Sequence, residues 1–158
     1  MSLQKFKTIW PNLLMAVTNI TAVLPIRLAF INGDYLTASL ILFTAFASVT
    51  SHLWENFKHG MNSITPISQE LSLNLNRLDR FACSLTTIRL LYLFIEKHGY
   101  NFRILLDHPF MFSPFIFEQI SEYDKYNPRL RNIYLVTHSI WHLTIFPAMD
   151  FFMSTFIY

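Results

Sequence analysis

Two histidines, His138 and His142, stand four residues apart in the segment HSIWH, inside the apolar run Ile133–Phe152. A four-residue step places both rings on one face of a helix, one turn apart, so both can bind a single metal ion. Polar groups of this kind are costly in a membrane helix, so a compensating interaction is expected. The segment therefore predicts two ligands of a metal site.

The earlier part of the chain contains three more candidates for the same site. Ser48 and His52 repeat the four-residue step near the end of another apolar stretch, and Asp79 opens a third. Three neutral imidazoles and an open fourth position are typical of catalytic zinc, which lowers the pKa of its bound water to about 7 and polarises a carbonyl. We therefore predict Zn²⁺ held by His52, His138 and His142. Asp79 is the predicted general base, and Ser48 would orient the water or donate to the developing oxyanion.

Each of these residues also has a purely structural interpretation. An intramembrane histidine can simply hydrogen-bond a neighbouring helix, and serine is common where membrane helices pack. Asp79 could be an interfacial charge or a helix N-cap. Asp107 and His108 are substitutes for a misassigned ligand, and Glu55 either orients His52 or is solvated.

The composition indicates that the chain folds in a membrane. Hydrophobic residues make up 53% of the 158 and charged residues 14%, with a mean hydropathy of +0.33. The net charge of +2, without a basic stripe interleaved with aromatics, argues against a nucleic-acid partner. The lone Cys83 cannot form an internal disulfide. No linker or repeat divides the chain, so residues 1–158 are interpreted as a single integral membrane domain.

Five segments approach the roughly 20 apolar residues that a bilayer core requires. They are Leu13–Ile31, Tyr35–Trp54, Phe81–Ile95, Phe102–Ile120 and Ile133–Tyr158. The first is interpreted as a retained span kinked at Pro25, because no clear small-residue cleavage site of a secretory signal follows it. The polar stretch Glu55–Arg77 is expected to lie over the membrane surface. The predicted fold class is an all-α, polytopic membrane helix bundle of about five spans.

The fourth segment, Phe102–Ile120, is the weakest of these spans. It contains charged residues and two prolines, and each charge at a helix centre costs about 3 kcal/mol on insertion scales. If this segment crosses the membrane, His52, Asp79 and the later histidine pair lie toward the same face. If it does not cross, they lie at opposite faces. The metal site and the fourth span therefore depend on each other.

The ordered set Ser48-x-x-x-His52, Asp79 and His138-x-x-x-His142 resembles the CREST superfamily of seven-helix membrane proteins. The superfamily groups alkaline ceramidases, progestin and adipoQ receptors, and the transmembrane protein 8 group with myomaker. Four stretches are most similar to the transmembrane protein 8 branch: TNITAVLP at 18–25, LFTAFASVTSH at 42–52, LNRLDRF at 75–81, and HSIWH. That branch includes a phospholipase that acts on GPI-anchored proteins, and myomaker, which promotes membrane fusion.

The resemblance implies a zinc-dependent membrane hydrolase that acts on a lipid amide or ester, with membrane lipids and the bilayer as partners. The alternative that it implies is a noncatalytic membrane-remodelling or lipid-receptor protein of the myomaker type, including a degenerate or truncated family member. Only about one span fits between Glu96 and Arg131, so two central helices of the seven are expected to be missing. Loss of a pair preserves the orientation of the last span but removes walls of the lipid pocket.

The side of the membrane on which the site lies has two interpretations. Most Lys and Arg residues gather on the face that would carry the N-terminus, the Glu55–Arg80 loop and the Ser121–Asn132 loop. The positive-inside rule assigns that face to the cytoplasm. The resembling phospholipase branch implies the outer face instead.

Overall fold

Helices make up nearly all of the protein. The computed structural model describes residues 3–56, 63–124, 129 and 131–158, and these ranges contain no β-strand. The elements are α1 (Leu3–Thr18), the 3₁₀ helix η1 (Asn19–Ala22), α2 (Val23–Ile31), α3 (Tyr35–Leu53), α4 (Gln69–His98), α5 (Arg103–Leu106), the 3₁₀ helix η2 (Pro109–Phe112), α6 (Ser113–Asp124), α7 (Arg131–Phe152) and the π-helix η4 (Met153–Ile157). The all-α prediction is confirmed.

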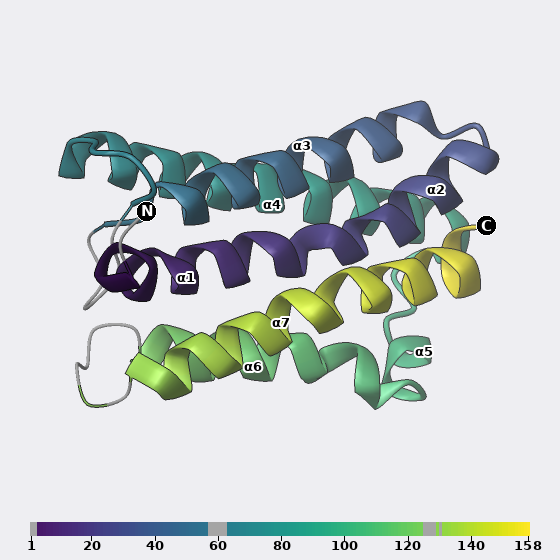
Figure 1. Cartoon of the computed structure of the whole chain (residues 1–158). Coiled ribbons are helices and arrows are strands. Elements are labelled where there is room, and N and C mark those ends of the chain that lie inside the picture. The colour runs from purple at the N-terminus through teal and green to yellow at the C-terminus, as the bar shows by residue number, and fades with distance from the viewer. Residues whose placement is uncertain (1–2, 57–62, 125–128, 130) are drawn as a thin grey trace.

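Three helical stretches are long and apolar enough to cross a membrane: Ile9–Ile31, Tyr35–Leu53 and Asn132–Ile157. They correspond to the first, second and last predicted spans. Figure 1 shows the helices of these stretches running side by side, with α4 along α3 and α6 along α7. The chain therefore has the composition of a membrane protein with three candidate spans.

The first of these stretches is interrupted by the 3₁₀ turn η1. Pro25 has no N–H to donate to the carbonyl of Thr21, four residues earlier, and that carbonyl lies inside the turn. The predicted interruption is therefore present, about one turn before the proline that causes it.

Helix α4 begins well before the predicted third span, Phe81–Ile95. Ser68 caps its N-terminus by accepting a hydrogen bond from the backbone N–H of Leu71 at 3.1 Å, and Glu70 lies in the positively polarised first turn. The stretch Glu55–Arg77 is thus not a loop throughout, because its last residues are helical. Residues 57–62 of that stretch lie outside the described ranges.

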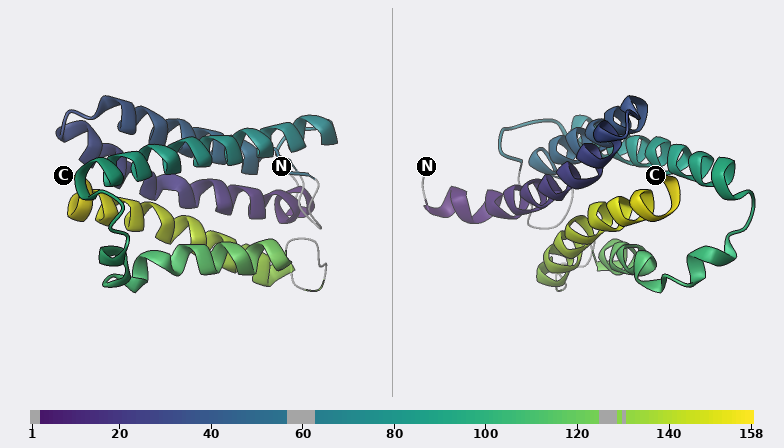
Figure 2. Two further views of the ribbon diagram at one scale, coloured as in Figure 1. Left: turned by 180° about the vertical axis from the view of Figure 1, so that it is seen from behind. Right: turned by 90° about the vertical axis from the view of Figure 1, so that its right-hand side faces the viewer.

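The segment Phe102–Ile120, the weakest of the predicted spans, does not form one continuous helix. It consists of α5, η2 and the first part of α6. Pro109 and Pro114 cannot donate backbone hydrogen bonds, and each disfavours helical geometry in the residue before it. Figure 2 shows the chain curving away from the bundle after α4 and then returning along α7 through α6. The reversal places the start of α7 at the level of the end of α3.

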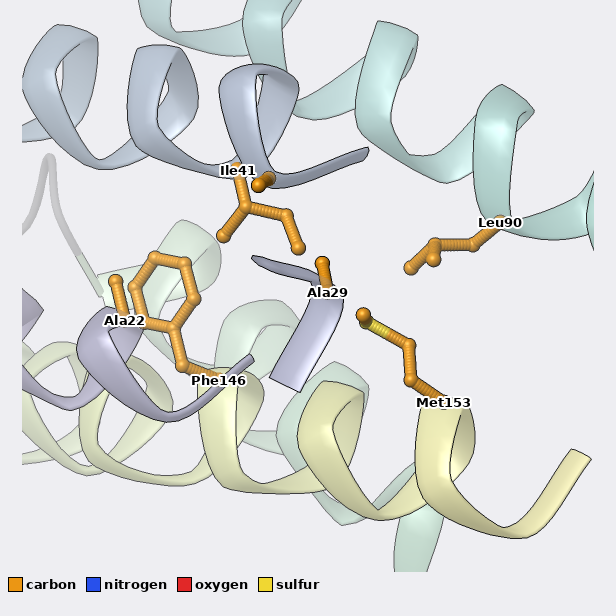
Figure 3. Close-up of a cluster of buried hydrophobic side chains, with 7 residues drawn as sticks. Ala22, Ala29, Ile41, Leu90, Phe146 and Met153 are labelled. Carbon is orange, nitrogen blue, oxygen red and sulfur yellow. The ribbon is translucent and has the colours of Figure 1, made fainter. Parts of the chain in front are cut away.

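A buried apolar cluster holds α2, α3, α4 and α7 together. Its labelled members in Figure 3 are Ala22, Ala29, Ile41, Leu90, Phe146 and Met153. Ala29, Ile41 and Met153 have no exposed surface. Small residues such as the two alanines let helix backbones approach closely, which favours packing in membranes. The core lies between the two polar clusters described below.

A polar cluster ties the α2–α3 turn to α4. The Asp34 carboxylate accepts hydrogen bonds from the backbone N–H of Thr37 at 3.0 Å and from Nη2 of Arg89, which is 3.2 Å from both carboxylate oxygens. Burial raises the pKa of Asp34, but the Thr37 hydrogen bonds and the Arg89 charge outweigh it and lower the pKa below its ordinary value. The Tyr158 hydroxyl also donates to Asp34, at 3.3 Å. Burial and the Asp34 charge raise the pKa of Tyr158 to about 12, so the phenol stays protonated.

Candidate metal centre

The three predicted imidazoles meet in the interior of the bundle. Nε2 of His52 lies 2.9 Å from Nε2 of His142 and 3.2 Å from Nε2 of His138. One nitrogen from each ring lies within 4.8 Å of the other two. The exposed fractions are 1% for His52, 5% for His138 and 1% for His142. The structure therefore brings together three buried histidines that could bind a metal ion.

Hydrogen bonds from the first helical stretch fix the backbone around these histidines. His52 lies in the last turn of α3, where the side-chain amide of Asn12 donates to the carbonyls of His52 at 2.7 Å and Glu55 at 2.8 Å. The hydroxyl of Thr21 donates to the carbonyl of His142 at 3.1 Å. The first stretch thus holds α3 and α7 in the register that brings the rings together.

Hydrogen bonding between the rings does not account for this geometry by itself. A ring nitrogen carries either one hydrogen or one lone pair in the ring plane, so Nε2 of His52 can make one good hydrogen bond, yet two nitrogens lie within 3.2 Å of it. In a tetrahedral site with zinc–nitrogen bonds of about 2.0–2.1 Å, ligand nitrogens lie about 3.3 Å apart. The two measured separations are close to that value. The donor set and these two separations are therefore compatible with a metal ion such as zinc.

The outer ring nitrogens of two histidines face polar partners. Nδ1 of His52 lies 3.4 Å from Oε2 of Glu55, which has no exposed surface. Nδ1 of His138 lies 3.2 Å from Oγ of Ser121. The Ser121 hydroxyl donates its hydrogen to the carbonyl of Glu118 at 2.8 Å, so its oxygen is left to accept from Nδ1–H of His138. A proton on Nδ1 leaves the Nε2 lone pair for a metal.

Of these two partners, the sequence suggested only Glu55. Its interpretation as a solvated side chain is wrong, because the carboxylate is buried beside His52. Ser121 was missed. Its partner lies 17 residues away on the next helix, and a serine near the end of a polar helix carries no signal of that contact.

Asp79 and Ser48 lie near the histidines without belonging to the close group of ligand atoms. Asp79 is buried well inside α4, so its interpretation as a helix N-cap is wrong. Its Oδ1 accepts a long contact from Sγ of Cys83 at 3.9 Å. Ser48 is 2% exposed, one turn before His52, and its Oγ has no hydrogen-bond partner among the described residues. Their predicted catalytic roles remain predictions.

Two cavities adjoin the histidines. The larger has a volume of about 760 Å³, and Ser48, Asp79 and His142 line it together with many apolar side chains of α4, α6 and α7. The smaller, about 40 Å³, lies against His52 and His138. Four residues line both cavities: Asp79, Arg80, Glu118 and Trp141. The histidine cluster is therefore adjacent to a space large enough for part of a lipid.

The proposed substitute ligands lie elsewhere. The ring of His108 is surrounded by those of Phe110, Phe151 and Phe156, at centroid distances of 6.3, 5.5 and 5.4 Å. Asp107 is exposed on the same connection between α4 and α6. Neither residue joins the histidine cluster, so the interpretation of these residues as substitutes is wrong.

Comparison with known proteins gives one informative similarity. No family model matches the chain, and no solved structure matches it. The chain is 41% identical over 151 residues to uncharacterized protein L282 of Acanthamoeba polyphaga mimivirus, and the aligned region covers 93% of this chain and 99% of the viral protein. The chain therefore belongs to the same family as this mimivirus protein.

Proposed function

We propose that the protein is a zinc-dependent membrane hydrolase that cleaves a lipid amide or ester. The observation that carries the proposal is the convergence of three buried imidazole nitrogens beside a mainly apolar cavity of about 760 Å³. Zinc, when bound, supplies Lewis-acid activation of a water molecule and of the substrate carbonyl. The resemblance to the CREST superfamily supports the same chemistry.

Two further side chains would act on the substrate. Asp79 lines both cavities, so it can take a proton from the attacking water and return it to the leaving group. Ser48 lines the larger cavity and is available to donate a hydrogen bond to the oxyanion that develops on the carbonyl. Glu55 and Ser121 would hold the rings of His52 and His138 in the ligating tautomer.

The proposal includes a membrane bundle of about five spans, in which α4 and the broken segment Phe102–Ile120 are the third and fourth. Helix α4 has 30 residues, so it is about 45 Å long and exceeds the thickness of a bilayer core. One of its internal charges, Arg89, is paired with Asp34, which lowers the cost of placing that arginine in a membrane. The irregular turns around Pro109 are tolerable there if protein shelters them.

A noncatalytic role is the competing function, and one set of contacts favours it. Polar side chains elsewhere in the bundle simply join helices, as the hydroxyls of Thr44 and Thr86 do at 2.8 Å. The histidine cluster could serve the same purpose in a lipid receptor or a membrane-remodelling protein. In that case the rings would join α3 to α7 by hydrogen bonds and would bind no metal.

Metal analysis of the purified protein in detergent tests the proposal first. We expect one zinc ion per chain, and His138→Ala should lose it because one of three protein ligands is removed. His108→Ala is the matched control, because that histidine packs among aromatic rings away from the site. Wild-type protein without zinc, or His138→Ala with unchanged zinc, would remove the mechanism.

Asp79→Asn separates the two functions. With a fluorogenic long-chain acyl ester and its matching acyl amide as probes, a hydrolase should lose turnover while zinc stays bound. A noncatalytic role predicts that wild-type protein turns over neither probe, even when zinc is added, and that Asp79→Asn leaves thermal stability nearly unchanged. Turnover by wild-type protein that is lost in Asp79→Asn with zinc still bound indicates a hydrolase. No turnover and an unchanged thermal stability indicate the noncatalytic role.

A further inference from the structure

The larger cavity has a polar end and an aromatic end. Along α4 its lining runs from Asp79 to Phe94, and along α7 it runs from His142 to Phe152. The two helices run in the same direction (Figure 1). Asp79 of α4 and His138 and Trp141 of α7 lie close to one another, because all three line the smaller cavity. Between the ends, its lining is mostly apolar. The cavity is therefore a channel along the helices that begins at the histidine cluster.

Three stacked aromatic rings line the far end of this channel. The ring of Phe94 lies 5.7 Å from that of Phe102 and 5.8 Å from that of Phe152, centroid to centroid. Phe94 has no exposed surface. Phe102 is 41% exposed, so the cost of displacing the rings lies mainly in the packing of Phe94 and Phe152. They form a stop for whatever occupies the channel.

The length of the channel corresponds to one acyl chain of a bilayer. His142 and Phe152 are ten residues apart on a helix, a distance of about 15 Å. The hydrocarbon core of a bilayer is about 30 Å thick, so the acyl chains of one leaflet reach about 15 Å. A chain whose carbonyl lies at the polar end would extend to the aromatic stop.

The exposed rim of the channel is apolar in part. Ile88 and Leu91 of α4 and Phe115 of α6 line the cavity and are 63%, 43% and 51% exposed. These side chains would contact lipid in a membrane, and Arg80, Ser84 and Thr87 are the exposed polar residues of the rim. An acyl chain could therefore enter sideways between α4 and α6, past the apolar part of the rim.

We propose that Phe94, Phe102 and Phe152 determine the longest acyl chain that this site accepts. The proposal deepens the proposed hydrolase function, because it states which substrates fit. A chain longer than the channel must push the rings apart, whereas a shorter chain exchanges one hydrocarbon environment for another. The result is an upper limit on chain length with little discrimination below it.

Binding of saturated fatty acids to the full chain in lipid nanodiscs tests the limit without any reaction. Fatty acids from decanoate to eicosanoate compete with a spin-labelled fatty acid, and the immobilised fraction of the label is measured by electron paramagnetic resonance. Relative to the bilayer, affinity should stay nearly constant up to a cut-off length. Beyond it, affinity should fall about fivefold or more, the change that corresponds to the ~1 kcal/mol lower end of overpacking costs.

Two substitutions should move the cut-off in opposite directions. Phe94→Leu removes part of the stop and should admit longer chains. Ala148→Phe fills the channel about 9 Å from His142 and should admit only shorter ones. It adds volume to an existing space, so it tests the proposal even if Phe94→Leu fails to fold. Phe156→Leu is the control, because Phe156 packs against Phe94 but does not line the cavity.

The same experiment separates this inference from the zinc mechanism. An unchanged cut-off in both Phe94→Leu and Ala148→Phe, or no immobilised label in wild-type protein, overturns the inference even if zinc is bound. Movement of the cut-off as expected sustains it even if metal analysis finds no zinc. His138→Ala should keep the wild-type cut-off, since it removes a ligand at the opposite end of the channel.

Discussion

Helix α3 has a polar cluster at each end, and the two clusters differ in how their charged and polar groups are paired. At its start, the negative charge of Asp34 meets the positive charge of Arg89, with further donors from Thr37 and Tyr158. At its end, three imidazole nitrogens of His52, His138 and His142 face one another. The first cluster is electrically complete with protein atoms alone. The second brings together three ring nitrogens that could bind a metal ion.

The difference indicates what each cluster contributes. A charge pair between the α2–α3 turn and α4 stabilises helix packing, and removal of either partner leaves the other buried in part and uncompensated. If the three histidines bind a metal ion, their contribution to stability depends on that external ligand. The two ends of α3 should therefore respond to different perturbations.

The largest expected effect is the loss of thermal stability when the metal is removed. Chelation should lower the thermal stability of wild-type protein, because a ligand that binds only the folded state stabilises it by about 4 kcal/mol when its free concentration is a thousandfold above Kd. The double variant His138→Ala/His142→Ala should not respond to the chelator. Arg89→Met should respond as wild-type protein does. Equal responses of wild-type protein and the double variant to the chelator would mean that the histidines do not bind a stabilising metal ion.

The next largest effect is expected when the charge pair between Asp34 and Arg89 is broken. Arg89→Met should lower the free energy of unfolding by about 1–3 kcal/mol, because it leaves the partly buried Asp34 carboxylate without its cationic partner. The double variant Asp34→Asn/Arg89→Met should recover part of the loss. Denaturant unfolding in micelles measures both. Loss of zinc from Arg89→Met would show that the two clusters are coupled, contrary to the independence argued above.

A smaller effect is expected from the partner of the His52 ring. Glu55→Gln should weaken zinc binding about tenfold, the lower end of the range for groups that orient a metal-bound histidine. Competition with a coloured zinc chelator measures the affinity. Glu70→Gln is the matched control, because that glutamate is exposed in the first turn of α4. An equal affinity in the two variants would mean that Glu55 does not orient His52.

The histidine cluster was predictable because two local signals fix it. Four-residue spacing sets the face on which His138 and His142 lie, and the apolar stretches set the level of His52 relative to them. The fourth segment, predicted to be the weakest span, is broken in the structure near its two prolines, Pro109 and Pro114. The site survives the break because the chain reverses at the prolines and returns along α7.

The surroundings of the cluster were harder to predict because they depend on tertiary packing. Glu55 is buried only because Asn12, more than 40 residues earlier, holds the end of α3 in place. Ser121 reaches His138 through the packing of α6 on α7. The charge of Arg89, inside α4, is paired with a residue of the α2–α3 turn. None of these contacts follows from periodicity or spacing.

The smallest expected effect is the acid dependence of the Asp34 cluster. The folded-state pKa of Asp34 lies below the ordinary value of 3.8, because the Thr37 hydrogen bonds and the Arg89 charge outweigh the effect of burial. A carboxyl with a depressed pKa contributes stability that is fully present above the unfolded-state pKa and is lost as the pH falls through the folded-state pKa. The contribution should therefore be constant above about pH 4 and decline below it.

The free energy of unfolding of wild-type protein minus that of Asp34→Asn, measured against pH, isolates this contribution from other carboxyls. The difference should shrink on acidification, and it should be smaller at every pH in an Arg89→Met background, where the Arg89 charge is missing. A difference that is flat to the lowest pH at which the protein folds would mean that Asp34 titrates alike in both states. Arg89 would then stabilise the turn through the packing of its side chain rather than through its charge.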